Sequence, residues 1–129
     1  MNAQSVSGSR LPTILLIDDE PDLLIAWALL LELEGFHVVT ATNGREGLDT
    51  AQQIRPALIV TDLMMPGMDG VQVCRAVRAD PQLNAVPVIL WTASIDIPAG
   101  TSCDRVLHKP VARDAMLRHI RALLRVHGA

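Results

Sequence analysis

Short apolar runs alternate with longer stretches of mixed polarity along this chain. Runs short enough to form strands occupy residues 14–17, 37–41, 57–61, 86–91 and 105–108. Stretches with helical periodicity, or with helical start and stop residues, occupy 21–34, 45–53, 71–79 and 113–126. The strand runs are apolar throughout, which is typical of strands covered on both faces. The alternation therefore predicts an α/β fold in which helices cover both faces of a parallel sheet.

Capping signals support the same division near the first helix. Pro21 suits the first position of a helix, and Asp19 or Glu20 before it is expected to cap that helix. Gly35 is expected to end it. These signals put the acids of "DDEPD" between the first strand and the first helix.

Length and composition indicate one domain with an ordinary core. The chain has 129 residues, and half of them are hydrophobic. We expect a polar leader at 1–10, a single domain at 11–126 and a tail at 127–129. The longest apolar run, 23–31, is too short to cross a bilayer, which takes roughly 20 residues. We therefore expect no membrane association.

The net charge and the cysteine content indicate which ligands and which cellular compartment to expect. The net charge of −3 provides no basic footprint for nucleic acid, so we expect no nucleic-acid binding. Cys74 and Cys103 have no metal-binding or disulfide-scaffold spacing, and we expect neither to act in a site. So few cysteines favour a reducing cytoplasm as the location.

Polar side chains follow four of the predicted strands at the point where each strand ends. Asp18 and Asp19 follow the first strand, and Asp62 follows the third. Thr92 follows the fourth strand, and Lys109 follows the fifth. Any one of them alone is an ordinary cap or loop residue. Ligands of open parallel sheets bind outside the carboxyl ends of the strands, so all five at this edge predict a functional site.

The chemistry of this set favours a divalent cation and a phosphoryl group. Three neighbouring carboxylates repel one another by on the order of a few kcal/mol per pair at an effective dielectric constant of about 20. Mg²⁺ removes that repulsion, because it takes carboxylate oxygens together with phosphate oxygens. Lys109, the single lysine among eleven cationic side chains, supplies a compact positive charge. Asp62 is then the candidate nucleophile for an aspartyl phosphate, and the Thr92 hydroxyl is a candidate donor to a phosphoryl oxygen.

Four segments together resemble one protein family. They are "LLIDDEPDL", "LIVTDLMMPGMDG", "PVILWTA" and "HKP", in that order, within a region from about residue 11 to 124. In this combination the chain resembles the receiver domain of bacterial two-component response regulators. The resemblance implies a flavodoxin-like five-stranded parallel sheet of order 2-1-3-4-5 with helices on both faces. It also implies that a histidine kinase or a histidine phosphotransfer protein donates a phosphoryl group to the domain.

The resemblance assigns a metal site and an acceptor. Asp62 would accept the phosphoryl group from a phosphohistidine. Asp19 and Asp62 would contact Mg²⁺ directly, and Asp18 would act largely through bound water. The backbone carbonyl of Met64 would be a further metal ligand.

The resemblance also assigns the groups around the phosphoryl oxygens. Lys109 would pair with the phosphoryl group, Thr92 would donate a hydrogen bond to it, and the small Ala93 would leave room for it. Pro110 would follow a cis-prone peptide bond that aims Lys109 into the site. Catalysis would be positioning and charge neutralisation, and phosphorylation would shift a conformational equilibrium. We therefore expect an acceptor protein, not an enzyme with turnover.

Three departures from the family pattern concern output, not phosphoryl chemistry. Val106 stands where the family usually has an aromatic switch residue, and Val111 stands where phenylalanine often follows the Lys-Pro pair. The interval 93–108 is short and contains Pro98 and Gly100. Proline interrupts a helix interior at a cost of about 3 kcal/mol. We therefore expect the family's fourth helix to be missing, very short or disordered.

The first helix is predicted to be apolar on every side. Its segment "DLLIAWALLLELEG" spans more than two turns without a polar face, and exposed apolar surface often marks an interaction site. The residues expected to meet a partner are Leu24, Ile25, Ala28 and Leu31. In the family this helix receives the kinase or phosphotransfer helices. The alternative is a leucine-rich and alanine-rich helix without a partner.

Four functions fit the pattern to different degrees. The first is a stand-alone receiver that signals to an unknown protein target, as a monomer or a phosphorylation-dependent dimer. The second is a receiver excised from a hybrid histidine kinase or a longer regulator. The third is a Mg²⁺-dependent phosphatase with an aspartyl-phosphate intermediate, and it is disfavoured because Glu20 replaces the second Asp of the expected DxD. The fourth is a degenerate receiver that only binds proteins, and retention of all five site residues argues against it.

Overall fold

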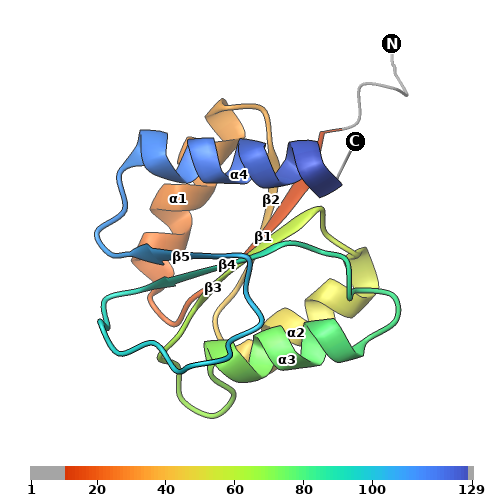
Figure 1. Ribbon diagram of the computed structural model, residues 1–129. Coiled ribbons are helices and arrows are strands. Elements are labelled where there is room, and N and C mark those ends of the chain that lie inside the picture. Colours follow the sequence, from red (N-terminus) through yellow and green to blue (C-terminus); the bar gives the residue numbers. More distant parts are fainter. Residues whose placement is uncertain (1–10, 128–129) are drawn as a thin grey trace.

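The computed structural model describes residues 11–127, so the predicted leader at 1–10 and the last two residues of the predicted tail lie outside the described residues. Figure 1 shows a parallel sheet with helices on both sides. Its strands are β1 (Thr13–Ile17), β2 (His37–Ala41), β3 (Leu58–Asp62), β4 (Val88–Thr92) and β5 (Arg105–His108). Its helices are α1 (Pro21–Leu33), α2 (Gly44–Ile54), α3 (Gly70–Ala79) and α4 (Arg113–His127). The strand order is β2-β1-β3-β4-β5, which confirms the predicted fold.

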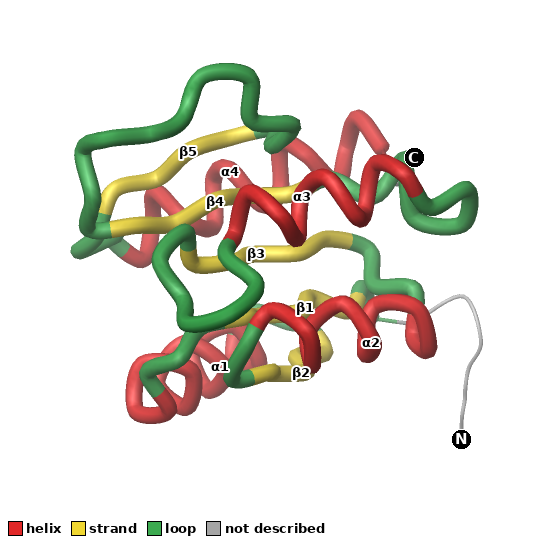
Figure 2. The backbone as a smooth tube through the Cα atoms, turned by 90° about the horizontal axis from the view of Figure 1, so that it is seen from below, coloured by secondary structure: helices red, strands yellow, loops and turns green. Residues whose placement is uncertain are grey.

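The sheet separates two apolar layers. Helices α2 and α3 lie on the near side of the sheet in Figure 2, and α1 and α4 lie behind it. In β1, Ile14 and Leu16 pack toward α1 and α4, whereas Leu15 and Ile17 pack toward α2 and α3. Side chains alternate between the faces of a strand, so a strand buried on both faces is apolar at every position. This is why the strand runs in the sequence are continuous.

The ends of β3 and β4 differ from the prediction by one or two residues. Asp62 and Thr92 were expected just after their strands, but each is the last residue of its strand. Asp62 pairs with Trp91 in the ladder between β3 and β4. Ladder hydrogen bonding, which sequence patterns do not report, therefore holds the backbone at both polar residues.

Helix α1 corrects two predictions. Glu20 is its N-cap residue, but no side chain caps the helix. Leu24 and Leu31, predicted to meet a partner, are buried with Trp27 against the sheet. Positions i, i+3 and i+7 form one helical face, and a helix apolar on all sides does not reveal which face that is.

The outer side of α1 keeps apolar residues in contact with solvent. Of the predicted partner-facing residues, Ile25 is exposed and Ala28 is half-buried. Leu29 and Leu33 are exposed as well. Among the described residues, no helix combines the length and the apolar character that a membrane crossing needs.

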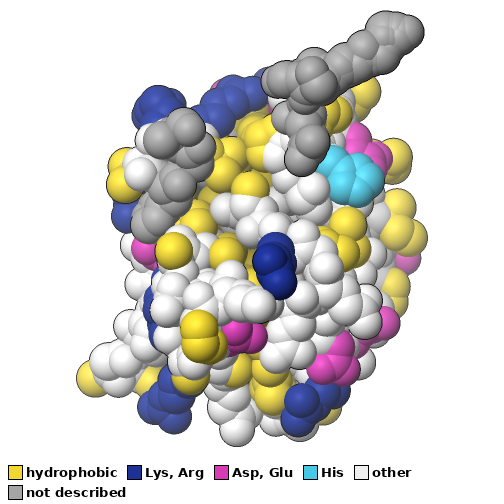
Figure 3. All heavy atoms as spheres, turned by 90° about the vertical axis from the view of Figure 1, so that its right-hand side faces the viewer, with side chains coloured by type: hydrophobic (Ala, Val, Ile, Leu, Met, Phe, Trp, Pro, Cys, Tyr) yellow, Lys and Arg dark blue, Asp and Glu magenta, His cyan; other side chains and the backbone are white. Residues whose placement is uncertain are grey.

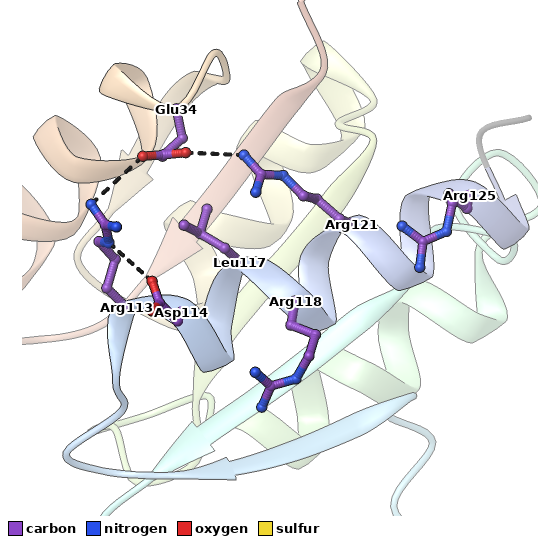
Figure 4. A pocket seen from close by; sticks show the side chains of 7 residues that line it. All are labelled: Glu34, Arg113, Asp114, Leu117, Arg118, Arg121 and Arg125. Carbon is purple, nitrogen blue, oxygen red and sulfur yellow. Dashed lines mark hydrogen bonds and ion pairs between the residues drawn. The ribbon is translucent and has the colours of Figure 1, made fainter.

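Helix α4 is joined to the end of α1 by charged side chains. Glu34 accepts a hydrogen bond from Arg121 at 3.0 Å and lies 3.7 Å from Arg113. Figure 4 shows both arginines reaching from α4 toward Glu34, while Arg118 and Arg125 project from the side of the same helix that faces away from Glu34. These surface ion pairs contribute little to stability, and the buried apolar face of α4 supplies most of its packing.

The segment between β4 and β5 contains no helix. Residues 93–104, all of them described, run as loop and turns, so of the predicted alternatives the structure shows a missing fourth helix. Ile97, Cys103 and Val106 close this segment over a small apolar cluster of Leu63, Val71 and Leu90. Val106, which stands where the family usually has an aromatic residue, therefore packs with the loop that replaces the helix.

Gly70 lies against the backbone of β3 at the start of α3. A Cβ atom at Gly70 would lie 2.3 Å from the Asp62 carbonyl oxygen and 2.9 Å from the Leu63 Cα atom. Backbone atoms cannot rotate away, so we expect Gly70→Ala to lower the free energy of unfolding by about 1–3 kcal/mol. Urea unfolding monitored by circular dichroism measures this. Arg75→Ala, at an exposed position of the same helix, is the control, and equal midpoints for the two variants would contradict the close approach.

Candidate functional site

The predicted polar residues meet at the carboxyl ends of the strands. In Figure 1 the arrowheads of β4 and β5 point to the left, and this edge of the sheet carries the site. Asp18 and Asp19 follow β1, Asp62 ends β3, Thr92 ends β4, and Lys109 follows β5. Parallel strands all end at the same edge, which is why residues from four strand ends come together.

Three carboxylates form a compact group at this edge. One oxygen from each of Asp18, Asp19 and Asp62 lies within 4.8 Å of the others. Asp18 is fully buried and Asp62 is 6% exposed, whereas Asp19 is exposed to solvent. The group therefore combines two buried acids with one at the surface, and it is open on the side of Asp19.

Lys109 is the cation that faces these acids. Its Nζ donates a hydrogen bond to Asp18 Oδ2 at 2.7 Å and lies 3.6 Å from Asp62 Oδ1. Asp18 also accepts a hydrogen bond from the Glu20 backbone amide at 3.0 Å. One ammonium thus partly balances two buried carboxylates.

Burial and neighbouring charge act on Asp62. Loss of solvent and then the negative charge of Asp18 raise the pKa of Asp62 above its ordinary value. The charge of Lys109 and a hydrogen bond from the Met64 amide oppose that rise without reversing it. The Asp62 carboxylate is therefore electrostatically strained, and a cation relieves that strain.

The same environment acts on Lys109 in two directions. Burial lowers the pKa of Lys109, but the hydrogen bond and charge of Asp18 outweigh it, so the net pKa is raised. Asp62 and Glu20 add to the rise. Lys109 therefore stays protonated at neutral pH and keeps its positive charge at the site.

Two residues near Lys109 were missed by sequence reasoning. Glu20 Oε1 lies 3.7 Å from Lys109 Nζ, and the Nζ sits 5.3 Å from the ring centre of Trp91, within the range of a cation–π contact. The position of Glu20 next to Asp19 in the sequence could have indicated that Glu20 lies at the site. Nothing in the sequence indicated this for Trp91, because it occupies an ordinary position in an apolar strand.

Thr92 and its neighbours complete the site beside the carboxylates and Lys109. The Thr92 hydroxyl is buried and accepts a hydrogen bond from the Ser94 amide at 3.0 Å, which leaves its own proton free to donate. The Lys109 amide donates to the Thr92 carbonyl at 2.8 Å, so the ends of β4 and β5 are fixed together. Ala93 is exposed beside Thr92, and the Lys109–Pro110 bond is cis as predicted.

Met64 has an observed contact different from the predicted one. Its backbone amide donates to the Asp62 carboxylate, and its side chain is exposed. The Met64 carbonyl as a metal ligand stays a prediction.

The carboxylate group fits a hard divalent cation. Mg²⁺ prefers oxygen ligands at about 2.0–2.1 Å and keeps several waters when it binds through one or two carboxylates. Three carboxylate oxygens within 4.8 Å of one another, one of them from an exposed side chain, meet that requirement. Asp18, Asp19 and Asp62 are the residues that would hold the ion.

Comparison with known proteins settles the family. Residues 14–121 match the response regulator receiver domain. The chain belongs to this family. The resemblance seen in the sequence is therefore confirmed. The acidic residues, Thr92 and Lys109 lie at the strand ends where the four matching segments are found.

Individual relatives agree with this assignment. The transcriptional regulatory protein AfsQ1 of Streptomyces coelicolor is 41% identical over 120 residues, covering 89% of this chain and 52% of AfsQ1. The signal receiver domain of a histidine kinase from Syntrophus aciditrophicus is 30% identical, with a TM-score of 0.83 over 89% of this chain and 91% of that domain. TrrA of Thermotoga maritima, in complex with Mg²⁺ and BeF, is 28% identical, with a TM-score of 0.81 over 88% of this chain and all of TrrA.

The curated relatives are longer than this chain. The receiver domain spans about half the length of AfsQ1 and of MtrA from Mycolicibacterium smegmatis, which is named a DNA-binding response regulator. The expectation of no nucleic-acid binding therefore concerns these residues alone. Figure 3 shows the face opposite the site, where charged side chains of both signs are scattered among hydrophobic and uncharged ones.

Proposed function

We propose that this receiver domain accepts a phosphoryl group on Asp62 in a Mg²⁺-dependent reaction. The observation that carries the proposal is the meeting of Asp62 with Asp18, Asp19 and Lys109 at one strand edge, with an Asp18–Lys109 contact of 2.7 Å. The donor is the phosphohistidine of a histidine kinase or of a histidine phosphotransfer protein. The similarity to TrrA, described with Mg²⁺ and BeF, supports the same donor set.

The chain's own residues account for the transfer. An Asp62 carboxylate oxygen attacks phosphorus, an O–P bond forms, and the P–N bond to the donor imidazole breaks. Lys109, 3.6 Å from Asp62, neutralises charge on the incoming phosphoryl oxygens, and the free proton of Thr92 donates to one of them. The bound Mg²⁺ would supply further positive charge to the phosphoryl oxygens. Lys109 Nζ already lies 3.6 Å from Asp62, so a short shift of the flexible lysine side chain brings its ammonium to the phosphoryl oxygens.

We propose that the donor docks beside α1. Ile25 and Leu29 are exposed on this helix, one turn apart, and Ile25 lies close in sequence to Asp19 and Glu20 of the site. A helix from the donor protein fits a surface of this kind.

Output is proposed to pass through the segment between β4 and β5. Val106 packs with Ile97 and Cys103 against Leu63, the residue after Asp62. A phosphoryl group on Asp62 acts on this cluster through Leu63, the next residue along the chain. We further propose that the domain is cytoplasmic and accepts the phosphoryl group without enzymatic turnover. The residues of this chain suffice for the transfer, and the downstream target is a protein.

Incubation with acetyl phosphate and Mg²⁺, followed by intact-mass measurement, tests the proposal. We expect one phosphoryl adduct per chain that EDTA prevents. Ile25→Glu should leave this adduct unchanged but slow transfer from a phosphorylated phosphotransfer protein, which separates docking from chemistry. Steady hydrolysis of small phosphate esters would favour a phosphatase instead, and absence of an adduct from every donor would favour a degenerate receiver.

A further inference from the structure

The two cysteines of the chain meet in the fold. Cys74 on α3 is fully buried, and Cys103, at the end of the segment between β4 and β5, packs against the apolar cluster that contains Cys74. Both thiols are free, and each influences the pKa of the other, so the two sulfurs lie close together. They lie 29 positions apart in the sequence. Neither belongs to the acidic site, so their contact calls for a separate explanation.

Arg78 holds Cys103 in this place. It lies one helical turn after Cys74, and its Nε donates to the Ser102 carbonyl at 3.1 Å. Its guanidinium also pairs with the Asp104 carboxylate, which in turn accepts a hydrogen bond from the Val88 amide at 2.8 Å. The residues on both sides of Cys103 are thus bound to the helix that carries Cys74, so the thiol contact is part of a built arrangement.

The arrangement makes the two thiols chemically unequal. The neighbouring Cys74 thiol lowers the pKa of Cys103 to about 6, and the Thr101 hydroxyl, 3.4 Å from the Cys103 sulfur, adds to the effect. The neighbouring Cys103 sulfur and burial raise the pKa of Cys74 above its ordinary value. Cys103 is partly exposed, whereas Cys74 is inaccessible. Thiolate character and access together decide which cysteine reacts first, and both select Cys103.

We propose that Cys103 and Cys74 form a hydroperoxide-sensitive thiol pair that closes to an intramolecular disulfide. The Cys103 sulfur attacks one peroxide oxygen, an S–O bond forms, the O–O bond breaks, and water or an alcohol leaves with the proton. The Cys74 sulfur then attacks the resulting sulfenic acid, an S–S bond forms, and water leaves with the Cys74 proton. The two thiols lose two electrons in total, and the hydroperoxide gains them.

The disulfide would fasten the loop that replaces the family's fourth helix to α3. Cys103 and Ile97 of this loop share an apolar cluster with Leu63, next to Asp62. Oxidation would therefore restrict the segment through which output is proposed to pass. The thiol chemistry itself uses none of the acidic site, so it stands independently of the proposed phosphoryl transfer.

Intact mass of the folded chain before and after treatment with hydrogen peroxide tests the pair. We expect the loss of two hydrogen atoms per chain, reversal by dithiothreitol, and a cross-linked peptide containing Cys74 and Cys103. Cys74→Ser should stop at a sulfenic acid that a 1,3-dione reagent traps on Cys103. Cys103→Ser should react at least ~10-fold more slowly, because the remaining thiol is buried and protonated. Asp62→Asn, the control, should oxidise at the wild-type rate.

Three outcomes would overturn the pair. One is a wild-type chain that forms the cross-link only after unfolding in guanidinium chloride, which would mean that the thiols are apart in the fold. Another is an intermolecular disulfide as the main product on a non-reducing gel. The third is Cys103→Ser reacting as fast as wild type, which would move the reactive thiol to Cys74.

Discussion

Replacement of Asp62 by Asn is expected to abolish the phosphoryl adduct completely. An amide of the same shape cannot act as the attacking carboxylate, while the ladder pairing of residue 62 with Trp91 is a backbone feature that the substitution keeps. Intact mass after incubation with acetyl phosphate and Mg²⁺ measures the adduct. Asp49→Asn, which removes an exposed carboxylate from α2, should retain the full adduct, so the loss would report the site and not net charge.

The same variant is expected to be more stable than wild type at neutral pH without metal. Burial and the charge of Asp18 raise the folded-state pKa of Asp62 above the unfolded value. The folded chain therefore binds this proton more tightly, and stability falls as pH rises from the unfolded pKa through the raised folded pKa. Asn removes that loss, so the stability difference between the variants should grow over this window and stay constant above it.

Urea unfolding in EDTA between pH 3 and 8 measures this difference. Addition of Mg²⁺ should stabilise wild type and leave Asp62→Asn nearly unchanged, because the ion binds the carboxylates of the folded state. Persistence of the adduct in Asp62→Asn would place the acceptor elsewhere. A variant that is less stable than wild type in EDTA would contradict the strained carboxylate.

Lys109→Met is expected to have the second large effect, on stability as well as on transfer. It leaves the fully buried Asp18 carboxylate without the ammonium at 2.7 Å. Breaking a buried pair in this way costs about 3–5 kcal/mol, because the remaining charge stays buried without a partner. Loss of the cation should also slow phosphoryl uptake by on the order of 100-fold, the usual cost of removing one group that stabilises developing charge.

Thermal unfolding and the rate of adduct formation measure both effects. Mg²⁺ should restore part of the lost stability of Lys109→Met, since a divalent ion replaces the missing positive charge. Adding Asp18→Asn to Lys109→Met should restore stability without metal but not phosphoryl uptake. Arg118→Met, which removes an exposed cation of α4, is the matched control and should change the unfolding free energy by no more than about 0.5 kcal/mol. Equal stability of Lys109→Met and wild type in EDTA would contradict the paired site.

The pH range over which Lys109 contributes to the free energy of unfolding follows from the direction in which its pKa is shifted. Its pKa is raised in the folded chain, although burial alone would lower it, because Asp18 favours the charged form. The contribution is therefore fully present below the ordinary lysine pKa of about 10.4. It is lost only as pH rises through the still higher folded value. Wild type and Lys109→Met should converge in stability only at strongly alkaline pH.

The main site was predictable because it follows from topology. Asp18, Asp62, Thr92 and Lys109 each stand at a strand end, and parallel strands end at one edge. The contacts that the site residues make with neighbouring side chains were not predictable in the same way. Nothing in an apolar strand indicated that Trp91 would lie 5.3 Å from the Lys109 ammonium.

Helix α1 marks the limit of periodic patterns. Leu24 and Leu31 were predicted to face a partner, but they pack in the core, and Ile25 faces solvent. A helix with apolar residues on every side carries no moment that selects its buried face. Only the position of α1 against the sheet and α4 decides which leucines are covered.

The amino-acid sequence by itself determined the elements, the parallel sheet, the loss of a regular fourth helix and the identity of the acidic strand-end residues. Each of these depends on residues close together in the chain, or on the rule that parallel strands end together. Only the tertiary structure decided which carboxylate Lys109 bonds, 91 positions away, and that Cys103 packs against the apolar cluster of Cys74. Such contacts depend on how whole elements pack, which local periodicity does not encode.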